Sequence, residues 1–199
     1  MKNFIVLLVI CTQILFAQKK KINDDSRFSI GLLSGYTSFF GNNFLAKTYS
    51  NKPLVGIDSR MVLKNNFGLG GQIKFNSSNV NTTEFVGNSV VARFREFGLY
   101  GCYNYFLDDK FAQTTKAGFN NFQLKNTLEQ TKGIDYYTNG TSYFVASEFH
   151  YFLDDGISVM CTLEYSYIDL EDIQASKSLG TNYQAANRIG IELGIRFWF

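Results

Sequence analysis

The residues of this chain that are best suited to chemistry are a single histidine and two pairs of adjacent aspartates. His150 is the only histidine, and a proton relay through it would need a nucleophile within hydrogen-bond reach. Its expected neighbours on the same face of an extended strand are Glu148 and Phe152, and no catalytic motif surrounds them. We therefore expect His150 to be a structural residue. The sequence predicts no catalytic residue, no cofactor and no metal ligand.

The paired aspartates are explained by turn formation. Tyr-Phe-Leu-Asp-Asp occurs at 105–109 and again at 151–155, each time between segments of alternating hydrophobicity. Asp155-Gly156 is a strong hairpin signal, and aspartate favours turns because its side chain bonds to the nearby backbone. Lys-Asn-Asn at 64–66 takes the equivalent place earlier in the chain. Three tight turns are therefore predicted in place of acid–base or metal chemistry.

Two further groups of reactive residues also favour structural interpretations. The acidic stretch Asp169, Glu171 and Asp172 lacks the glycine and the ligand spacing of a calcium-binding loop. Apart from Cys11 near the amino terminus, the cysteines are Cys102 and Cys161, too few for a disulfide framework. They are expected to point to opposite faces of strands that are not neighbours, so we expect no disulfide between them.

The amino terminus resembles a secretory signal peptide. Lys2 precedes an apolar segment at 4–10, and Ala17-Gln18 is a plausible cleavage point. This divides the chain into a signal peptide, 1–17, and one domain, 18–199. The formal net charge is +2, and the short basic run at 19–21 is expected to be solvated, so nothing indicates a nucleic-acid partner.

The last eleven residues form the most informative segment. Ile191, Leu193, Ile195 and Phe197 fall on one face of an extended strand, and Glu192 and Arg196 on the other. Such a strand is long enough to cross a membrane when tilted. The chain ends on the aromatic residue Phe199.

Alternation of this kind recurs along the chain and predicts eight strands. They are expected near 28–39, 54–64, 67–76, 90–105, 110–119, 141–151, 157–168 and 189–199. Long polar connections are expected at 40–53, 77–89, 120–140 and 169–182. Short turns on one side and long loops on the other are typical of an outer-membrane barrel whose loops face outward, with both termini on the periplasmic side. The predicted fold is all-β: an eight-stranded antiparallel up-and-down transmembrane β-barrel.

Alternation alone does not decide which face is the core, because a soluble barrel and a membrane barrel reverse the two faces. The signal peptide, Phe199 and aromatic clusters at the strand ends favour the membrane. Those clusters are Tyr103, Tyr105 and Phe106; Phe149, Tyr151 and Phe152; and Tyr165 and Tyr167. A secreted lipocalin-like barrel or sandwich is the alternative.

The inward face of a membrane barrel would then carry the charges. We expect a structural network in the lumen made of Asp58, Arg60, Lys74, Glu96, Glu148, His150, Glu164, Arg188, Glu192 and Arg196. Lys64 is also expected on this face. Eight strands enclose a lumen just wide enough for side chains, and buried charges must pair. A narrow charged conduit is the alternative interpretation.

The signal peptide, the alternating strands and the terminal Phe199 resemble the small outer-membrane barrels of the OmpA/OmpX type. The Asn- and Tyr-rich composition, together with the Ala17-Gln18 cleavage point, resembles that of the PorT-like barrels of Bacteroidota. This resemblance implies location in the outer membrane, contact with its lipid, and recognition of Phe197 and Phe199 by the barrel-assembly machinery. The resemblance to such families implies a role in envelope integrity, adhesion or secretion, and the fold alone does not choose among these roles.

The leading hypothesis is a non-enzymatic outer-membrane barrel with a side-chain-filled lumen and four extracellular loops. It would serve envelope integrity, adhesion or the binding of an extracellular or envelope protein partner. A narrow small-solute channel is the first alternative. A lipid-modifying enzyme is the second, since lipid A acyltransferases and deacylases resemble this architecture.

Overall fold

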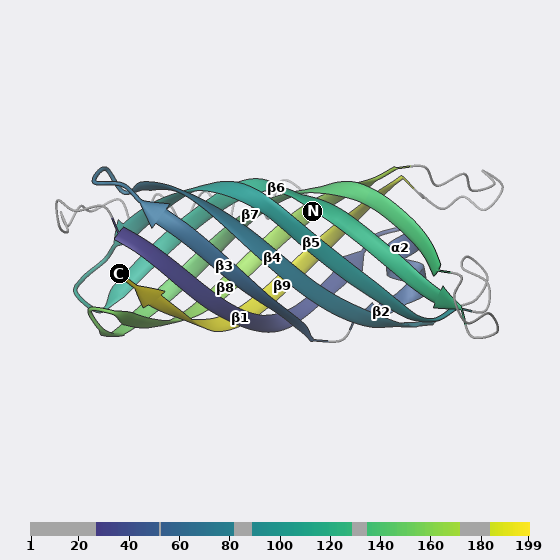
Figure 1. Cartoon of the computed structure of the whole chain (residues 1–199), viewed down its shortest axis with the longest axis horizontal. Coiled ribbons are helices and arrows are strands. Elements are labelled where there is room, and N and C mark those ends of the chain that lie inside the picture. Colours follow the sequence, from purple (N-terminus) through teal and green to yellow (C-terminus); the bar gives the residue numbers. More distant parts are fainter. Residues whose placement is uncertain (1–26, 52, 82–88, 129–134, 172–183) are drawn as a thin grey trace.

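A computed structural model describes residues 27–51, 53–81, 89–128, 135–171 and 184–199. The predicted signal peptide at 1–17 and the predicted loop residue Asp172 lie outside these ranges. Within them the chain forms a closed antiparallel barrel of eight long strands plus the short strand β2 (Figure 1). The elements are β1 (Arg27–Phe40), α2 (Phe44–Thr48), β2 (Tyr49–Asn51), β3 (Leu54–Val62), β4 (Phe67–Val80), β5 (Ser89–Phe106), β6 (Phe111–Leu128), β7 (Asp135–Asp154), β8 (Ile157–Leu170) and β9 (Ala185–Trp198).

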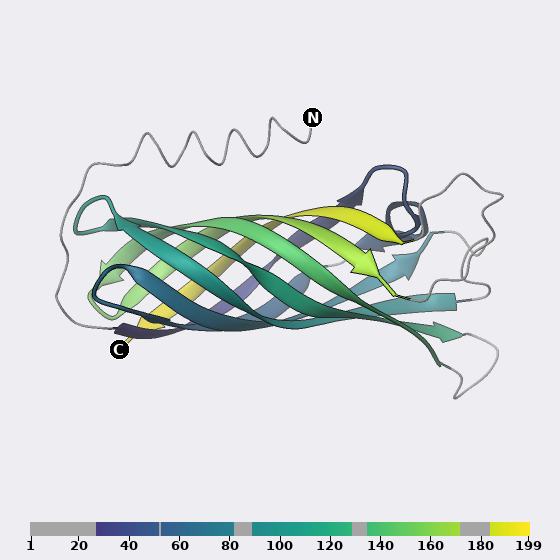
Figure 2. The ribbon, with the colours of Figure 1, turned by 90° about the horizontal axis from the view of Figure 1, so that it is seen from above.

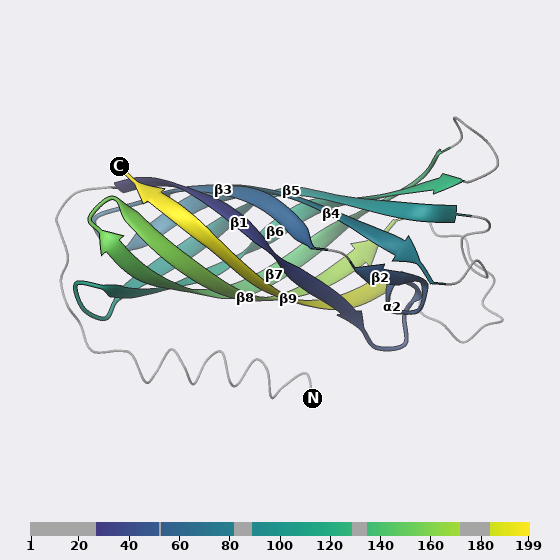
Figure 3. The same ribbon diagram turned by 90° about the horizontal axis from the view of Figure 1, so that it is seen from below.

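Each long strand pairs with its neighbours in the chain, and the first and last strands close the barrel. Around the barrel the order of the long strands is β4-β3-β1-β9-β8-β7-β6-β5, with β5 pairing back to β4. At the seam, Leu32 of β1 is the register partner of Ile195 of β9. Figure 3 shows these two strands side by side, with the start of β1 and the carboxy terminus at the same end. The predicted up-and-down eight-stranded barrel is confirmed.

Short turns join the strands at the end where β1 starts and β9 finishes. The side-chain oxygen Oδ1 of Asp108 accepts bonds from the backbone N–H groups of Lys110 (2.7 Å) and Phe111 (2.8 Å). Asp154 accepts one from Gly156 in the same way, at 2.8 Å. The aspartates therefore build turns. We call this the short-turn end and the opposite end the loop end.

The first predicted connection, 40–53, is more ordered than a polar loop. It contains α2, whose N-cap Asn43 accepts a bond from the Ala46 N–H at 2.9 Å, and then β2, which pairs with the end of β4. The helix buries Phe44 and Leu45. β2 and β3 both pair with β4 in the same direction, and the only proline, Pro53, stands between them, where its missing N–H ends a ladder.

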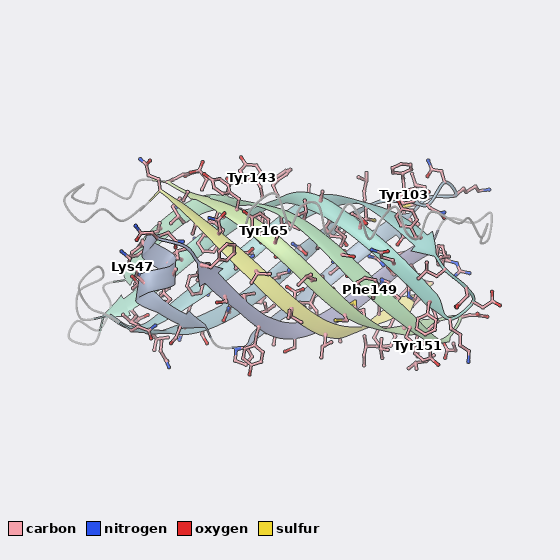
Figure 4. All side chains as sticks on the ribbon, turned by 180° about the vertical axis from the view of Figure 1, so that it is seen from behind. Lys47, Tyr103, Tyr143, Phe149, Tyr151 and Tyr165 are labelled. Atoms are coloured by element: carbon pink, nitrogen blue, oxygen red, sulfur yellow. The ribbon has the colours of Figure 1, made fainter. Side chains whose placement is uncertain are left out.

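The outer wall is apolar across the middle of every long strand. Large exposed hydrophobic residues include Leu32, Ile57, Leu69, Leu99 and Leu193. Aromatic residues mark both edges of this band: Tyr143 and Tyr165 lie towards the loop end, and Tyr103 and Tyr151 towards the short-turn end (Figure 4). Phe106 and Phe152 were expected in the same clusters, and that expectation is wrong. Phe152 is buried inside the short-turn end, and Phe106 packs against it.

β6 and β7 continue well past the apolar band, which corrects the third predicted loop. β6 extends to Leu128 and β7 begins at Asp135, so most of 120–140 is strand. In Figure 2 strands β6 and β7 can be followed to the loop end. Here the pattern reverses: Phe119 is exposed on the outside, whereas Phe122 and Leu124 are buried inside.

This reversal occurs on several strands and creates an apolar core at the loop end. Phe39, Phe94 and Ile168 also point inward there, as part of a cluster that includes Phe44 and Leu45 of α2. A strand segment beyond the apolar band faces water on its outer side, so its apolar residues pack inward as in a soluble barrel. The same strands thus carry apolar residues on the outer face along the apolar band and on the inner face at the loop end.

No helix in the described part of the chain is long and apolar enough to cross a membrane.

Candidate functional site

The inside of the barrel brings together all ten residues that the sequence analysis assigned to the lumen. Each is at most 4 % exposed. They come from β3, β4, β5, β7, β8 and β9. Lys64, expected on the same face, instead lies exposed in the turn after β3, because β3 ends at Val62. The candidate site is therefore a buried network of charges.

One group of charges lies nearer the short-turn end. Arg60 Nη1 donates to Glu148 Oε1 at 2.8 Å, and Lys116 Nζ donates to Glu148 Oε2 at 2.7 Å. Arg196 pairs with Asp58, whose second oxygen accepts the Tyr100 hydroxyl at 2.5 Å. Because each carboxylate has at least two donors, the cost of burying its charge is offset by charge-assisted hydrogen bonds.

A second group lies nearer the loop end. Lys74 Nζ donates to Glu164 and to Glu192, both at 2.6 Å. Arg188 faces Glu96 with both terminal nitrogens and also reaches Glu164 at 3.2 Å. The fork of an arginine matches two carboxylate oxygens, and this geometry fixes both side chains.

The charges of the network balance. Among the described residues the lumen holds five cations, Arg60, Lys74, Lys116, Arg188 and Arg196, and five carboxylates, Asp58, Glu96, Glu148, Glu164 and Glu192. Lys116 was missed by the sequence analysis. The signal was nonetheless there, because the apolar residues Ala117 and Phe119 at alternate positions predict an outward face, and Lys116 must then point inward.

His150 lies inside the short-turn end among groups that resemble a catalytic triad by distance. Its Nε2 is 2.8 Å from Glu148 Oε1, and its Nδ1 is 3.2 Å from Ser158 Oγ. The sequence analysis had expected no nucleophile beside it. However, Ser158 has no exposed surface and accepts a bond from the Trp198 indole at 3.0 Å. Arg60 also reaches Nε2 at 3.0 Å. A substrate has no approach to this serine, so the arrangement is suited to packing.

Apolar clusters close the lumen at both ends. At the short-turn end Val62, Ala112, Phe152 and Trp198 pack together. At the loop end the cluster around α2 covers the opening, and Tyr49 donates its hydroxyl to Asn126 Oδ1 at 2.9 Å. Burial raises the pKa of the Tyr49 hydroxyl. Charged side chains between two apolar caps leave the centre of the barrel filled.

The other predicted chemical residues do not form sites. Cys102 points inward and is buried, whereas Cys161 is exposed on the outer wall, and both are free thiols. Within the described ranges no group of three or more histidine, cysteine, aspartate or glutamate residues could hold a metal ion.

A closed antiparallel barrel with an apolar outer band and a charged interior defines an integral outer-membrane β-barrel. The chain belongs to the family described as outer membrane protein beta-barrel domain, which matches residues 4–197, and its location is the outer membrane. The narrower resemblance to PorT-like proteins stays a prediction. No curated protein sequence matches the chain.

Solved structures of small outer-membrane barrels are similar in fold. Neisserial surface protein A (NspA) is 10 % identical, with a TM-score of 0.58 over 85 % of this chain and 96 % of that one. Ail, the attachment invasion locus protein of Yersinia pestis, is 13 % identical, with a TM-score of 0.55 over 89 % of this chain and all of that one. OprG of Pseudomonas aeruginosa is 11 % identical, with a TM-score of 0.55 over 91 % and 99 %. At these identities the likeness concerns the fold alone.

Proposed function

We propose that this protein is a non-enzymatic, non-conducting outer-membrane barrel that binds an extracellular or envelope protein partner at its loop end. In this arrangement the loop end faces outward, the short-turn end faces the periplasm, and the barrel-assembly machinery recognises Phe197 and Phe199. A role in adhesion or in envelope integrity follows from such binding.

The observation that carries the proposal is the filled lumen. Three ion pairs, Arg60–Glu148, Lys74–Glu164 and Arg188–Glu96, join strands on opposite sides of the barrel. Pairs that cross the full width of the barrel leave no continuous path along its axis. The interior therefore supports the wall, and the parts available to a partner are those beyond the membrane.

The loop end supplies a rigid surface of this kind. The hairpin of β6 and β7 rises above the band, and its inner face is fixed by Phe122 and Leu124 in the apolar cap. Binding surfaces carried on ordered strands lose less conformational entropy than flexible loops do. This favours partner binding over a purely structural role.

The test shortens this hairpin without disturbing the cap. Asn126 and Tyr136 are register partners, so joining them through an Asn-Gly turn deletes 127–135 and keeps Leu124 and Asn126. We expect the barrel to assemble while adhesion, partner capture or resistance of the envelope to detergent is reduced. A matched control inserts three glycines between Asp108 and Asp109 at the other end. If the shortened protein retained every binding and envelope phenotype, the proposal would be wrong.

Two alternatives have their own tests. A small-solute channel requires discrete conductance steps in planar bilayers, and we expect none from the purified barrel. A lipid-modifying enzyme requires a change in lipid A mass that disappears in His150→Ala and Ser158→Ala. We expect lipid A to be the same with and without the protein.

A further inference from the structure

The outer wall is uneven, with three hollows that follow one another along β4 and β5. The hollow nearest the short-turn end has a volume of about 530 Å³ and is lined by Leu69, Gly101 and Ala117 among others. The middle one, about 510 Å³, contains Gly71 and Phe97. The third, about 290 Å³ and nearest the loop end, is lined by Phe75, Arg93 and Arg95 among others. Adjacent hollows lie beside consecutive outward positions of the same strands, and we call this row of three hollows the β4–β5 groove.

Two glycines form the floor of the β4–β5 groove. A Cβ atom added at Gly101 would meet nothing within 4 Å, and one added at Gly71 would meet only ordinary contacts of 3.4 Å or more. Leu69 and Leu99, 72 % and 63 % exposed, stand on either side. The glycines are therefore not required by close packing within the barrel, and their lack of side chains leaves space on the membrane face.

Two arginines stand at the loop end of the groove. Along β5 the outward positions from Tyr105 to Phe97 are aromatic, aliphatic or glycine, and the next two outward residues are Arg95 and Arg93. Ten residues separate Tyr105 from Arg95, which is about 33 Å of strand and about 25 Å of height at a tilt of about 40°. This height matches the apolar band of an outer-membrane barrel, so Arg95 lies at the level of the lipid headgroups and Arg93 just above it.

The two arginines lack carboxylate partners within the described part of the chain, and both are exposed. Lys125 of β6, the register partner of Arg93, adds a third cation beside them. At the matching edge of the band on the other side of the barrel, β8 carries Asp169, an exposed anion. Among the described residues compared at this level of the wall, the charge is therefore positive beside the groove and negative on β8.

We propose that the β4–β5 groove binds a lipid of the leaflet at the loop end, with a phosphate monoester on Arg93 and Arg95 and an acyl chain over Gly71 and Gly101. A phosphate monoester carries close to two negative charges, which matches two guanidinium groups, and arginine forks bind phosphate oxygens in pairs. The acyl chain fills the space that the glycines leave. Head and chain are thus recognised by adjacent parts of one surface.

The experiment measures lipid retention by native mass spectrometry of the barrel refolded in detergent micelles. The probe is a lipid A preparation with a single phosphate monoester, compared with the same lipid after phosphatase treatment, with phosphatidylglycerol and with inorganic phosphate. We expect one lipid A to be retained per barrel and the dephosphorylated form to be held about tenfold more weakly, because charge-assisted hydrogen bonds are lost. Inorganic phosphate should not displace the lipid at equal concentration.

Variants separate the two halves of the groove. Arg93→Gln with Arg95→Gln should lower retention of lipid A about tenfold. Gly101→Leu should lower it about fourfold, the equivalent of one methylene group displaced from the groove. Matched controls are Lys110→Gln, which removes an exposed charge at the short-turn end, and Val159→Leu, which adds volume to the wall across the barrel. Heat-modifiable gel migration verifies that each variant is folded.

The outcomes are decisive in either direction. Equal retention by the double arginine variant and the wild type would overturn the proposal, as would an equal loss in Lys110→Gln. If phosphatidylglycerol were retained as strongly as lipid A, the groove would bind anionic lipids in general, and the proposed recognition of a phosphate monoester would be wrong. Displacement by inorganic phosphate would show that the arginines bind the anion without the chain.

Discussion

Arg60 and Glu148 meet at 2.8 Å inside the lumen, although they belong to strands on opposite sides of the barrel. Neither side chain has exposed surface. β3 and β7 are four strands apart in either direction around the ring. This ion pair therefore spans the lumen and joins two facing walls of the barrel.

Removing one partner of this pair should destabilise the barrel strongly. We expect Arg60→Met to lower the free energy of unfolding by about 3–5 kcal/mol, because Glu148 is left with too few donors in a buried site. Adding Glu148→Gln to this variant should restore part of the loss. Urea unfolding in lipid vesicles measures both. Lys64→Met, in the exposed turn, is the control and should change stability by about 0.5 kcal/mol or less. A loss that Glu148→Gln does not relieve would show that Arg60 acts by packing alone.

The carboxy-terminal aromatic residue should matter for assembly more than for stability. Phe199 is 73 % exposed, and the two bonds that join it to Phe28 are made by backbone atoms. We expect Phe199→Ala to refold in vitro with a stability within about 1 kcal/mol of the wild type, but to reach the outer membrane in smaller amounts in cells. Phe28→Ala removes the ring that faces Phe199 at 6.2 Å and is the matched control. An equal assembly defect in both variants would assign the effect to the ring contact.

One glycine at the seam should tolerate no side chain. A Cβ atom at Gly35 would lie 2.2 Å from the backbone oxygen of Ile191 in the neighbouring strand β9. We expect Gly35→Ala to lower stability by about 2–4 kcal/mol, because the strands must separate locally. Gly101→Ala, which adds the same methyl group in open space, should be nearly neutral. The midpoint of heat-modifiable migration compares the two, and equal midpoints would contradict this account of the seam.

The cap at the loop end should weaken at alkaline pH. The pKa of Tyr49 is raised in the folded protein, so its contribution to stability is complete below the pKa of the unfolded state, about 10, and is lost as the pH rises above it. Tyr49→Phe should cost about 1 kcal/mol at neutral pH, since Asn126 loses a donor. It should also remove this part of the alkaline loss. Urea unfolding at several pH values gives the difference between the two proteins, and identical pH profiles would exclude Tyr49 as the titrating group.

The sequence predicted the barrel because the membrane imposes a strict alternation on each strand. Ile191, Leu193 and Ile195 face outward as expected, and Glu192 and Arg196 lie inside. The prediction failed above the membrane. From Asn120 and Asn121 onward, the apolar residues lie on the inner face of the strand and no longer on the outer face. An analysis that expects one unbroken alternation with apolar residues outside therefore takes this stretch for a loop.

The sequence predicted most of the charged residues that lie in the lumen, but it did not predict which of them form pairs. The alternation of side chains along each strand places Lys74 and Glu164 inside. Their contact, however, depends on which strands face each other across the barrel. That relationship follows from strand order and register, which no local pattern contains. The apolar cap was missed for the same reason, since Leu45 and Phe122 meet only after the barrel has closed.

The closing strand β9 completes the electrical neutrality of the interior. Without β9, the described lumen residues retain three cations and four carboxylates, and β9 brings Arg188, Glu192 and Arg196 to balance them. A chain that stops short of β9 would hold an unpaired negative charge and an open seam at the same time.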